Sequence, residues 1–430
     1  MNLTNNAMAT VLLCSRLNSK AQSVTPFSTK EWNLLAEKLL KSLIQEPGNL
    51  LGMNKLDIKG NLNLNDDEAD RVCNLLSRGA NIAFALDDLE KKSIYITTRS
   101  DSNYPCRLRK ILGKNAPPLL YYCGNLELAS QNSVAIVGSR NIDSDGEKFA
   151  RRLAEKSADE GYAVCSGGAK GVDQISETAA LDKNGYCISF LADSMTRKLR
   201  QKNIRDAVIS KRMLLISAVN PDAPFLAANA MSRNKYVYAM SQCAFVVASD
   251  YKKGGTWAGA TENLKSGKIT TYIWDNQKYR GNSHLIQMGG KGIADLEKLS
   301  ITELSKSLPQ VIQQLDFDTV SRTSKPLKPL TNSQLGIDDL ICKSETSMNE
   351  SKGIKEEKAN TRLDKDSIYL AVLPMLLEYL DAPKSLDEII GQFELTKKQT
   401  QEWLNRAVKE KVVLKASAPV KYSKADGCVK

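Results

Sequence analysis

The chain has 430 residues and a formal charge of +11 at pH 7, with an isoelectric point near 9.0. This length allows about two to four domains, and the positive charge favours a polyanionic partner such as nucleic acid over an anionic membrane surface. Nine cysteines without a CxxC pair argue against a zinc ribbon and a disulfide framework, and no apolar stretch is long enough to span a membrane. We therefore expect a cytoplasmic protein with no membrane partner.

Residues 1–99 are expected to form a helical module. In TKEWNLLAEKLLKSLIQ, four apolar residues share one helix face: Trp32, Leu35, Leu39 and Leu43. The stretch DDEADRVCNLLSRG begins with acids and ends at a glycine, as a helix often does. The next stretch, IYITTRSDSNYPCRLRKILGKNAPPLLYYCGN, predicts a short strand, an X-Pro turn, a basic helix and a second strand.

Six apolar runs then alternate with helical segments: SVAIVG, YAVCS, CISFLA, MLLISAV, AFVVAS and ITTYIW. Strands that are continuously apolar are buried on both faces, and strand-to-helix alternation implies right-handed βαβ units. The prediction for residues 100–318 is an α/β domain with a doubly wound, mainly parallel sheet.

The composition changes at residues 319–363, where Ser, Lys, Thr, Asn and Glu dominate, and we expect a flexible linker there. Residues 364–430 then predict an apolar helix, a helix that begins at KSLDE, a third helix and two short strands. The third helix would begin at Thr396 and bury Leu404 and Val408. This order of elements is typical of a winged helix.

Three glycine-rich segments follow predicted strands: VAIVGSRN, SGGAKGVD and KKGGTWAGATENL. Ligands of open parallel sheets bind at the carboxyl ends of strands, where backbone N–H groups and helix N-termini attract anions. The candidate phosphate ligands are Gly138, Ser139 and Arg140 in the first segment, Ser166, Gly167, Gly168, Ala169, Lys170 and Gly171 in the second, and Lys252, Lys253, Gly254, Gly255 and Thr256 in the third. The alternative is that these segments are only tight turns with solvated basic residues. Trp257 could stack on a base or simply pack at the start of its helix.

None of these segments is a P-loop or a GxGxxG fingerprint, which weakens the case for classical nucleotide hydrolysis and dinucleotide binding. A basic segment, TRKLRQKNIRDAVISKR, adds further candidate DNA contacts: Arg197, Lys198, Arg200, Lys202, Arg205, Lys211 and Arg212. We expect this segment on the same edge of the sheet, following a nucleic-acid backbone. The alternative is an ordinary solvated face.

Catalytic patterns are weak. The single histidine, His284, falls in a segment expected to be a polar loop. Asp173 and Glu177 lie four residues apart on one helix face and could form an acid–base pair or bind a ribose, but a capping Asp173 and a solvent-facing Glu177 are favoured. No spacing of cysteine and histidine resembles a metal site. We therefore expect no enzyme activity, no catalytic residue, no cofactor and no metal.

Between Ser100 and about Trp274, the segments YPCRLRKI, PPLLYYCGN, VAIVGSRNIDSDGEKFA, SGGAKGVDQISETAAL and MSRNKYVYAMSQCAFVVAS together resemble the DprA/Smf family of DNA-processing proteins. The resemblance implies a Rossmann-like domain that binds and protects single-stranded DNA and helps load a RecA-type recombinase in DNA uptake, natural transformation, recombination or repair. It also assigns Arg233 and Asn234 to the site. The partners expected are single-stranded DNA, the recombinase and a second copy of the chain in a homodimer.

The chain departs from the family pattern at three points: the usual histidine after the second loop is Glu177, the FPxRN segment is interrupted as FLAANAMSRN, and a family-typical glycine-serine loop is KKGGTWAGAT. The wider superfamily also contains nucleotide sensors and nucleotide-processing enzymes, which is the alternative function. A transcriptional regulator led by the winged helix is a third class. TKKQTQEWLNRAVKEK, however, offers mixed charges rather than a strongly basic reading helix.

Overall fold

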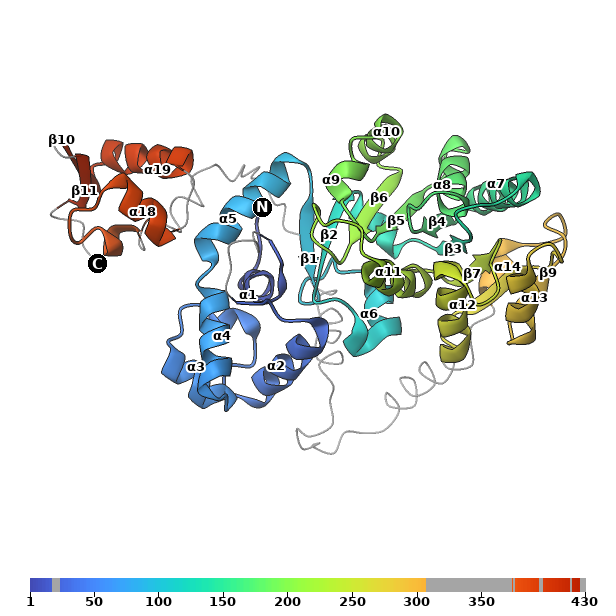
Figure 1. Ribbon diagram of the computed structural model, residues 1–430, viewed down its shortest axis with the longest axis horizontal. Coiled ribbons are helices and arrows are strands. Elements are labelled where there is room, and N and C mark those ends of the chain that lie inside the picture. The colour runs from blue at the N-terminus through green and yellow to red at the C-terminus, as the bar shows by residue number, and fades with distance from the viewer. Residues whose placement is uncertain (18–23, 307–372, 374–375, 394–396, 418–419, 426–430) are drawn as a thin grey trace, which may run out of the picture.

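The computed structural model describes residues 1–17, 24–306, 373, 376–393, 397–417 and 420–425. The predicted linker, residues 319–363, lies outside the described residues. Figure 1 shows N-terminal helices beside a large sheet covered by further helices, and a small C-terminal unit. Among the described residues, no helix has the length and apolar character needed to cross a membrane.

The N-terminal part is helical. Its helices are α1 (Asn5–Cys14), α2 (Thr29–Lys41), α3 (Lys55–Leu62), α4 (Asp66–Leu76) and α5 (Gly79–Lys91), with a 3-10 turn at Pro47–Leu50. α2 and α4 each begin with a reciprocal capping box, Ser28 with Glu31 and Asn65 with Glu68, in which each partner satisfies an unpaired amide of the other.

The predicted apolar face of α2 is correct for three of its four residues. Trp32, Leu35 and Leu39 are buried in the N-terminal core. Leu43 was predicted on the same face, but it is 92% exposed. The helix ends at Lys41 and the chain at Ser42 becomes extended, so the helical spacing no longer applies at Leu43.

The sheet has nine strands in the order β1-β2-β6-β5-β4-β3-β7-β8-β9. The strands are β1 (Tyr95–Thr98), β2 (Leu119–Gly124), β3 (Ser133–Val137), β4 (Ala163–Ser166), β5 (Cys187–Leu191), β6 (Met213–Ser217), β7 (Cys243–Val246), β8 (Thr270–Trp274) and β9 (Lys291–Ile293). β1 pairs with β2, and β2 with β6, in antiparallel register, whereas every pair from β6 to β9 is parallel. The prediction of a mainly parallel sheet is confirmed.

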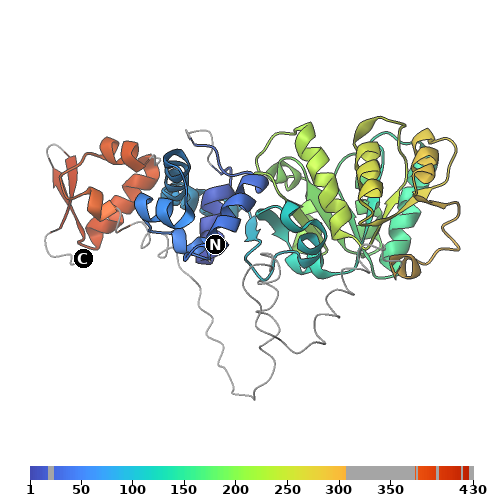
Figure 2. The same ribbon diagram turned by 90° about the horizontal axis from the view of Figure 1, so that it is seen from below.

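Helices cover both faces of this sheet (Figure 2). They are α6 (Cys106–Leu112), α7 (Ser144–Asp159), α8 (Val172–Asp182), α9 (Met195–Lys198), α10 (Lys202–Ile209), α11 (Ala227–Met240), α12 (Gly254–Ser266), α13 (Arg280–Gln287) and α14 (Ile301–Lys306), with 3-10 turns at Gly113–Asn115 and Leu126–Ser130. Within β3, Val134 and Ile136 pack with α7 and α8, while Ala135 packs with α6 and α11. Because neighbouring side chains of a strand point to opposite faces, the strand is buried on both.

His284, predicted in a loop, lies instead in α13. Leu285 is fully buried beside Ile273 and Ala260, and Ile286 packs against the same cluster, so two apolar residues anchor a helix that is otherwise polar. The His284 ring lies 3.9 Å from the Tyr251 ring, measured between centroids.

The C-terminal unit contains α18 (Leu386–Phe393), α19 (Lys397–Lys409) and an antiparallel hairpin of β10 (Val413–Ser417) and β11 (Val420–Lys424). Leu404 is fully buried and Val408 packs against the same small core, while Thr396 lies outside the described residues. The winged-helix assignment stays a prediction. Trp403 of α19 stacks on Phe84 of α5, with ring centroids 4.7 Å apart.

Candidate functional site

Three loops leave the sheet from one edge, and the glycines of the third predicted segment begin the helix that follows its loop. β4, β3 and β7 are neighbours and run parallel, so the segments that follow them emerge on the same side. These segments are residues 138–143, 167–171 and 247–253, and they lead into α7, α8 and α12, respectively. Gly171 has a φ of +76°, and an added Cβ there would lie 2.5 Å from the carbonyl oxygens of Ser139 and Arg140. The glycine therefore allows the second loop to approach the first closely.

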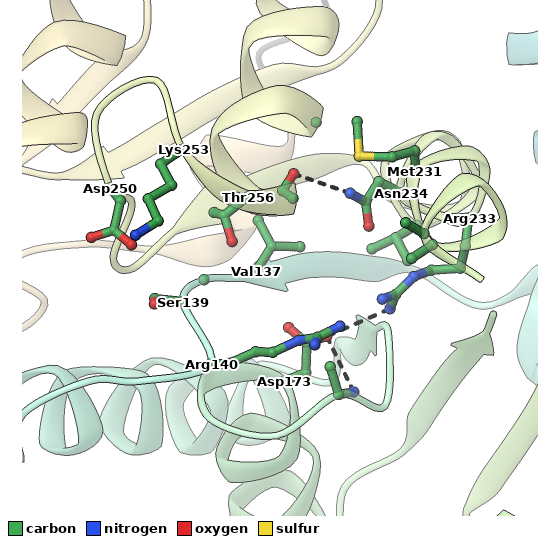
Figure 3. Close-up of a pocket in the computed structure, with 18 of the residues that line it drawn as sticks. Val137, Ser139, Arg140, Asp173, Met231, Arg233, Asn234, Asp250, Lys253 and Thr256 are labelled. Carbon is green, nitrogen blue, oxygen red and sulfur yellow. Dashed lines mark hydrogen bonds and ion pairs between the residues drawn. The ribbon is translucent and has the colours of Figure 1, made fainter. Parts of the chain in front are cut away.

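A cavity of about 760 Å³, here called the first cavity, opens between these loops and α11 (Figure 3). Of the residues predicted for the site, it is lined by Gly138, Ser139, Arg140, Ala169, Arg233, Asn234, Lys253, Gly254, Gly255 and Thr256. All three loops thus contribute to the cavity, and the two residues assigned by family resemblance alone, Arg233 and Asn234, lie on α11 beside it.

One wall of the first cavity is suited to an anion. α12 begins there, and in the described structure no side chain caps its first turn, since Lys253 at the N-cap makes no such hydrogen bond. The amides at the start of a helix carry partial positive charge and attract anions when they are uncapped. The Lys253 ammonium adds a full charge. Asn234 steadies this turn by donating from Nδ2 to the Gly255 carbonyl over 3.1 Å.

The mouth of the cavity combines a cation with an aromatic ring. Arg140 is exposed, and its guanidinium carbon lies 5.2 Å from the centroid of the Phe225 ring. Phe225 is 47% exposed, so part of its ring is available to a ligand. The sequence interpretation did not select Phe225. The feature of the sequence that could have identified Phe225 is a single aromatic residue in VNPDAPFL, the segment just before α11.

The floor of the cavity contains a buried ion pair. Arg233 Nη1 lies 3.5 Å from Asp173 Oδ2, and each side chain is 9% exposed. An added Cβ on Gly167 would lie 0.9 Å from Arg233 Nη1, so the guanidinium occupies the space that a side chain at Gly167 would need. Burial raises the pKa of Asp173, and the Arg233 charge partly opposes that rise. Arg233 Nε is buried without a hydrogen-bond partner.

The amides of the second loop are occupied by carboxylates from α8. Gly168 N donates to Glu177 Oε1 over 3.0 Å, and Ala169 N donates to Asp173 Oδ2 over 3.4 Å. Glu177 Oε1 also accepts from the Ser189 hydroxyl at 2.7 Å. The expectation of a solvent-facing Glu177 is therefore wrong: its side chain turns inward to the loop amide and to β5, and the residue is only 3% exposed.

The basic segment is split between the two edges of the sheet. Lys198, at the end of α9, donates from Nζ to the Gly168 carbonyl over 3.0 Å and so lies beside the second loop. Arg197 pairs with Asp193, and Arg200 is exposed just beyond α9.

Lys211 and Arg212 were expected on the same edge as the loops, but they precede β6, which is parallel to β5. The Arg212 carbonyl accepts from Cys187 N at the start of β5. α10 has therefore carried the chain back to the opposite edge, and the basic segment does not form one continuous surface.

The other predicted residues lie around the first cavity without lining it. The Ser166 hydroxyl is buried and donates to the Ile136 carbonyl over 2.7 Å. Lys170 is exposed at the tip of the second loop, and Lys252 has its ammonium 5.1 Å from the Tyr251 ring. Trp257 meets Tyr251 edge-on at 5.2 Å and packs on a small core, so it is a packed residue here.

No group of three or more metal-binding side chains occurs within the described residues. The arrangement instead offers uncapped amides, two cations and an exposed ring around one cavity. These groups suit a ligand with phosphate and an aromatic base.

Comparison with known proteins gives a consistent result. Residues 95–303 match the family model of DNA recombination-mediator protein A. Protein Smf from Escherichia coli is 27% identical over 168 residues, which cover 39% of this chain and 44% of that protein. DNA processing protein DprA from Streptococcus pneumoniae is 29% identical over 197 residues, covering 44% of this chain and 68% of that protein. DNA processing protein DprA from Bacillus subtilis is 26% identical over 207 residues, covering 46% of this chain and 68% of that protein.

Among solved structures, the X-ray structure of DNA processing protein A from Streptococcus pneumoniae superposes with a TM-score of 0.51 at 22% sequence identity. The match covers 70% of this chain and 100% of that chain. It shows a shared fold. The chain spans less than half of the length of the Escherichia coli relative, so the match concerns the sheet domain rather than the whole of that protein.

Proposed function

Over residues 95–303 the chain belongs to the DprA/Smf family of DNA-processing proteins, and from this premise we propose that it binds single-stranded DNA at the first cavity. The observation that carries the proposal is the group of anion-binding elements at one opening. The uncapped start of α12, Lys253 and Arg140 surround the cavity, and Phe225 lies exposed against Arg140.

In this proposal the DNA backbone supplies the anion. A phosphate accepts from the first-turn amides of α12 and is neutralised by Lys253, while Arg140 contacts the next phosphate or the base edge. An unpaired base stacks on the exposed face of Phe225. Such contacts depend on phosphate charge and on the face of a base rather than on the identity of the base. Binding should therefore tolerate any sequence, weaken steeply with salt and disfavour duplex DNA, whose bases are already stacked.

We propose binding rather than catalysis. Asp173 and Glu177, the two carboxylates closest to an acid–base arrangement, are engaged by Arg233, by loop amides and by Ser189. Incubation of the pure protein with nucleotides and with DNA should give no product. Hydrolysis or cleavage that disappears in Glu177→Ala or Asp173→Ala would overturn this part of the proposal.

The proposed role is protection of single strands and transfer of them to a RecA-type recombinase in DNA uptake, recombination or repair, with the protein acting as a homodimer. The support is membership of the family of DNA recombination-mediator protein A. The test is capture of the full chain from cells in the presence and absence of single-stranded DNA, with sedimentation of the pure protein for its subunit number. Recovery of no recombinase would contradict the loading role, and a monomer at working concentration would contradict the dimer.

A free nucleotide is the second candidate ligand, because the first cavity has the size and the phosphate-binding wall that a nucleotide needs. The two ligands differ in their salt dependence. A nucleotide sensor or nucleotide-processing enzyme should bind a mononucleotide tightly and with little effect of salt. A DNA-binding protein should bind a long single strand far more tightly and lose affinity as salt rises.

The deciding experiment is a parallel titration with a long single strand, the same sequence as duplex, and a mononucleotide, each at several salt concentrations. We expect the single strand to bind most tightly and with the steepest salt slope. Preference for the duplex, or tight binding of the mononucleotide with a flat salt slope, would contradict the proposed function.

A further inference from the structure

A second cavity of about 470 Å³ lies between the N-terminal helices and the sheet domain. Its lining comes from α2, from α6 and the turn after it, from α11 and from the second half of α12. α2 lies next to α6 (Figure 1), and Asn33 of α2 donates from Nδ2 to the Lys114 carbonyl over 2.6 Å. The cavity is therefore formed jointly by two parts of the chain that the sequence pattern treats as separate.

The second cavity is positively charged. Three lysines line it, Lys30, Lys235 and Lys268, against one carboxylate, Glu262, among the described lining residues. Lys235 pairs with Glu262 at 2.9 Å, and Lys268 donates from Nζ to the Ile111 carbonyl over 2.8 Å. Lys30 is exposed on α2. The excess of two positive charges favours an anionic ligand.

The two cavities are connected along α12. Gly255 lines the first cavity, Gly259 lines both, and Ser266 lines the second. These residues lie on one side of the helix, together with Asn263, at spacings of four, four and three. Tyr238 of α11 also lines both cavities. At 1.5 Å per residue, Gly255 to Ser266 spans about 16 Å along the helix axis. α11 packs closely against this side of α12: the Asn234 side chain lies over Gly255 and Gly259, and Lys235 pairs with Glu262 across the two helices.

We propose that a single strand bound at the first cavity passes over the outer surface of the contact between α11 and α12 and enters the second cavity, where Lys30 and Lys235 contact its phosphates. The inference rests on the proposed function and extends it. The N-terminal helices, through Lys30, become part of the DNA-binding surface. A length of about 16 Å accommodates roughly five phosphates at the 3.4 Å spacing of a stacked strand, and fewer in an extended one.

The test compares two double variants of the full chain on a short and a long oligonucleotide. Lys30→Ala with Lys235→Ala removes one cation of the second cavity from α2 and one from α11. Lys41→Ala with Lys265→Ala removes two exposed lysines, one from α2 and one from α12, that do not line either cavity. The oligonucleotides are one of about three nucleotides, which fills only the first cavity, and one of about 20, which is long enough to reach and pass the second cavity. Affinity is measured over a series of salt concentrations.

We expect the cavity variant to lower the salt slope for the long strand by about 1.4, because each lost phosphate contact of a single strand removes about 0.7. Its affinity for the short strand should match that of the control variant. Equal behaviour of the two variants on the long strand would overturn the inference, and would point instead to another occupant of the second cavity, such as an acidic protein segment. A loss of affinity that is equal for both strands would also contradict it, because the effect would then not depend on length.

Arg140→Ala separates failure of this inference from failure of the proposed function. If Arg140→Ala weakens both strands while the second-cavity variant behaves like its control, the first cavity still binds DNA and only the extension is wrong. If Arg140→Ala has no effect on either strand, the proposed function itself fails, and the extension fails with it.

Discussion

Glu177 shows how a single residue shapes the second loop. Its carboxylate accepts from Gly168 N and from the Ser189 hydroxyl, and Lys198 holds the carbonyl of the same glycine. The loop is therefore fixed from both sides of Gly168. Burial raises the pKa of Glu177, with the Lys198 charge and the Ser189 hydrogen bond acting in the opposite direction.

This raised pKa predicts a pH effect on stability. Because the folded-state pKa lies above the ordinary value of 4.5, the folded protein binds the proton more tightly than the unfolded chain does. The contribution of Glu177 to stability is thus largest below pH 4.5 and falls as the pH rises towards and through the raised pKa. Glu177→Gln keeps an oxygen acceptor but cannot ionise. The melting temperature of Glu177→Gln relative to wild type should therefore increase from pH 4.5 to pH 8.

Glu147→Gln on the exposed side of α7 is the control for removing one carboxylate. A difference between Glu177→Gln and wild type that stays constant with pH, or that falls as the pH rises, would contradict the burial argument for Glu177.

Residues that follow strands could be selected from the sequence, whereas residues whose role depends on distant partners could not. Gly138 and Arg140 were predictable because an apolar run ends immediately before them. The inward turn of Glu177 was not, since it needs Ser189 from the next strand and an amide nine residues earlier. Phe225 was missed because its exposure depends on the loop around it rather than on any helical or strand period.

At the level of elements, the central strands were predictable and the edges were not. β3 to β8 are continuous apolar runs, which is the pattern of strands buried on both faces. β9 has only three residues, two of them exposed, and offers no such pattern. The second half of α12 was visible as ENLKSGK, but its start was expected near Trp257 and lies at Gly254, because two glycines in a row favour a loop over a helix.

A cap added at the start of α12 should stabilise the fold and weaken DNA binding at the same time. Lys253 has φ −135° and ψ 142°, an extended conformation typical of an N-cap residue. Lys253→Asp should supply the missing cap and raise the free energy of unfolding by about 1 kcal/mol. The same carboxylate would occupy the amides proposed for phosphate and would repel DNA, so single-strand affinity should fall.

Lys253→Ala is the matched control, since it removes the positive charge without adding a cap. It should weaken DNA binding less than Lys253→Asp and should not stabilise the protein. If Lys253→Asp stabilises the fold and leaves DNA affinity at the wild-type level, the phosphate is not bound at the start of α12.

At the scale of the whole molecule, the groups that we propose to bind DNA belong to the sheet domain and to the N-terminal helices. The first cavity is lined entirely by residues between 137 and 259, and the second by residues between 29 and 269. The described residues of the C-terminal unit line neither cavity. Among the described residues, Trp403 of this unit stacks on Phe84 of α5, and α5 lines neither cavity.

The C-terminal unit should therefore be dispensable for single-strand binding. A truncation that ends near Thr319 should keep the wild-type salt slope and lose at most about tenfold in affinity, or about 1.4 kcal/mol. The measurement is a titration at several salt concentrations, with circular dichroism to show that the truncated protein is folded. Loss of binding in a folded truncation would move the DNA site to the C-terminal unit.

The most direct test of the central claim compares one cation at each edge of the sheet. Arg140 lines the first cavity, whereas Lys183 caps the far end of α8 at the opposite edge, and each can be replaced by alanine in the full chain. For a long single strand, Arg140→Ala should lower the slope of log affinity against log salt by about 0.7 and weaken binding, while Lys183→Ala should leave both unchanged. Equal effects of the two substitutions, or an effect of Lys183→Ala alone, would contradict DNA binding at the carboxyl edge of the sheet.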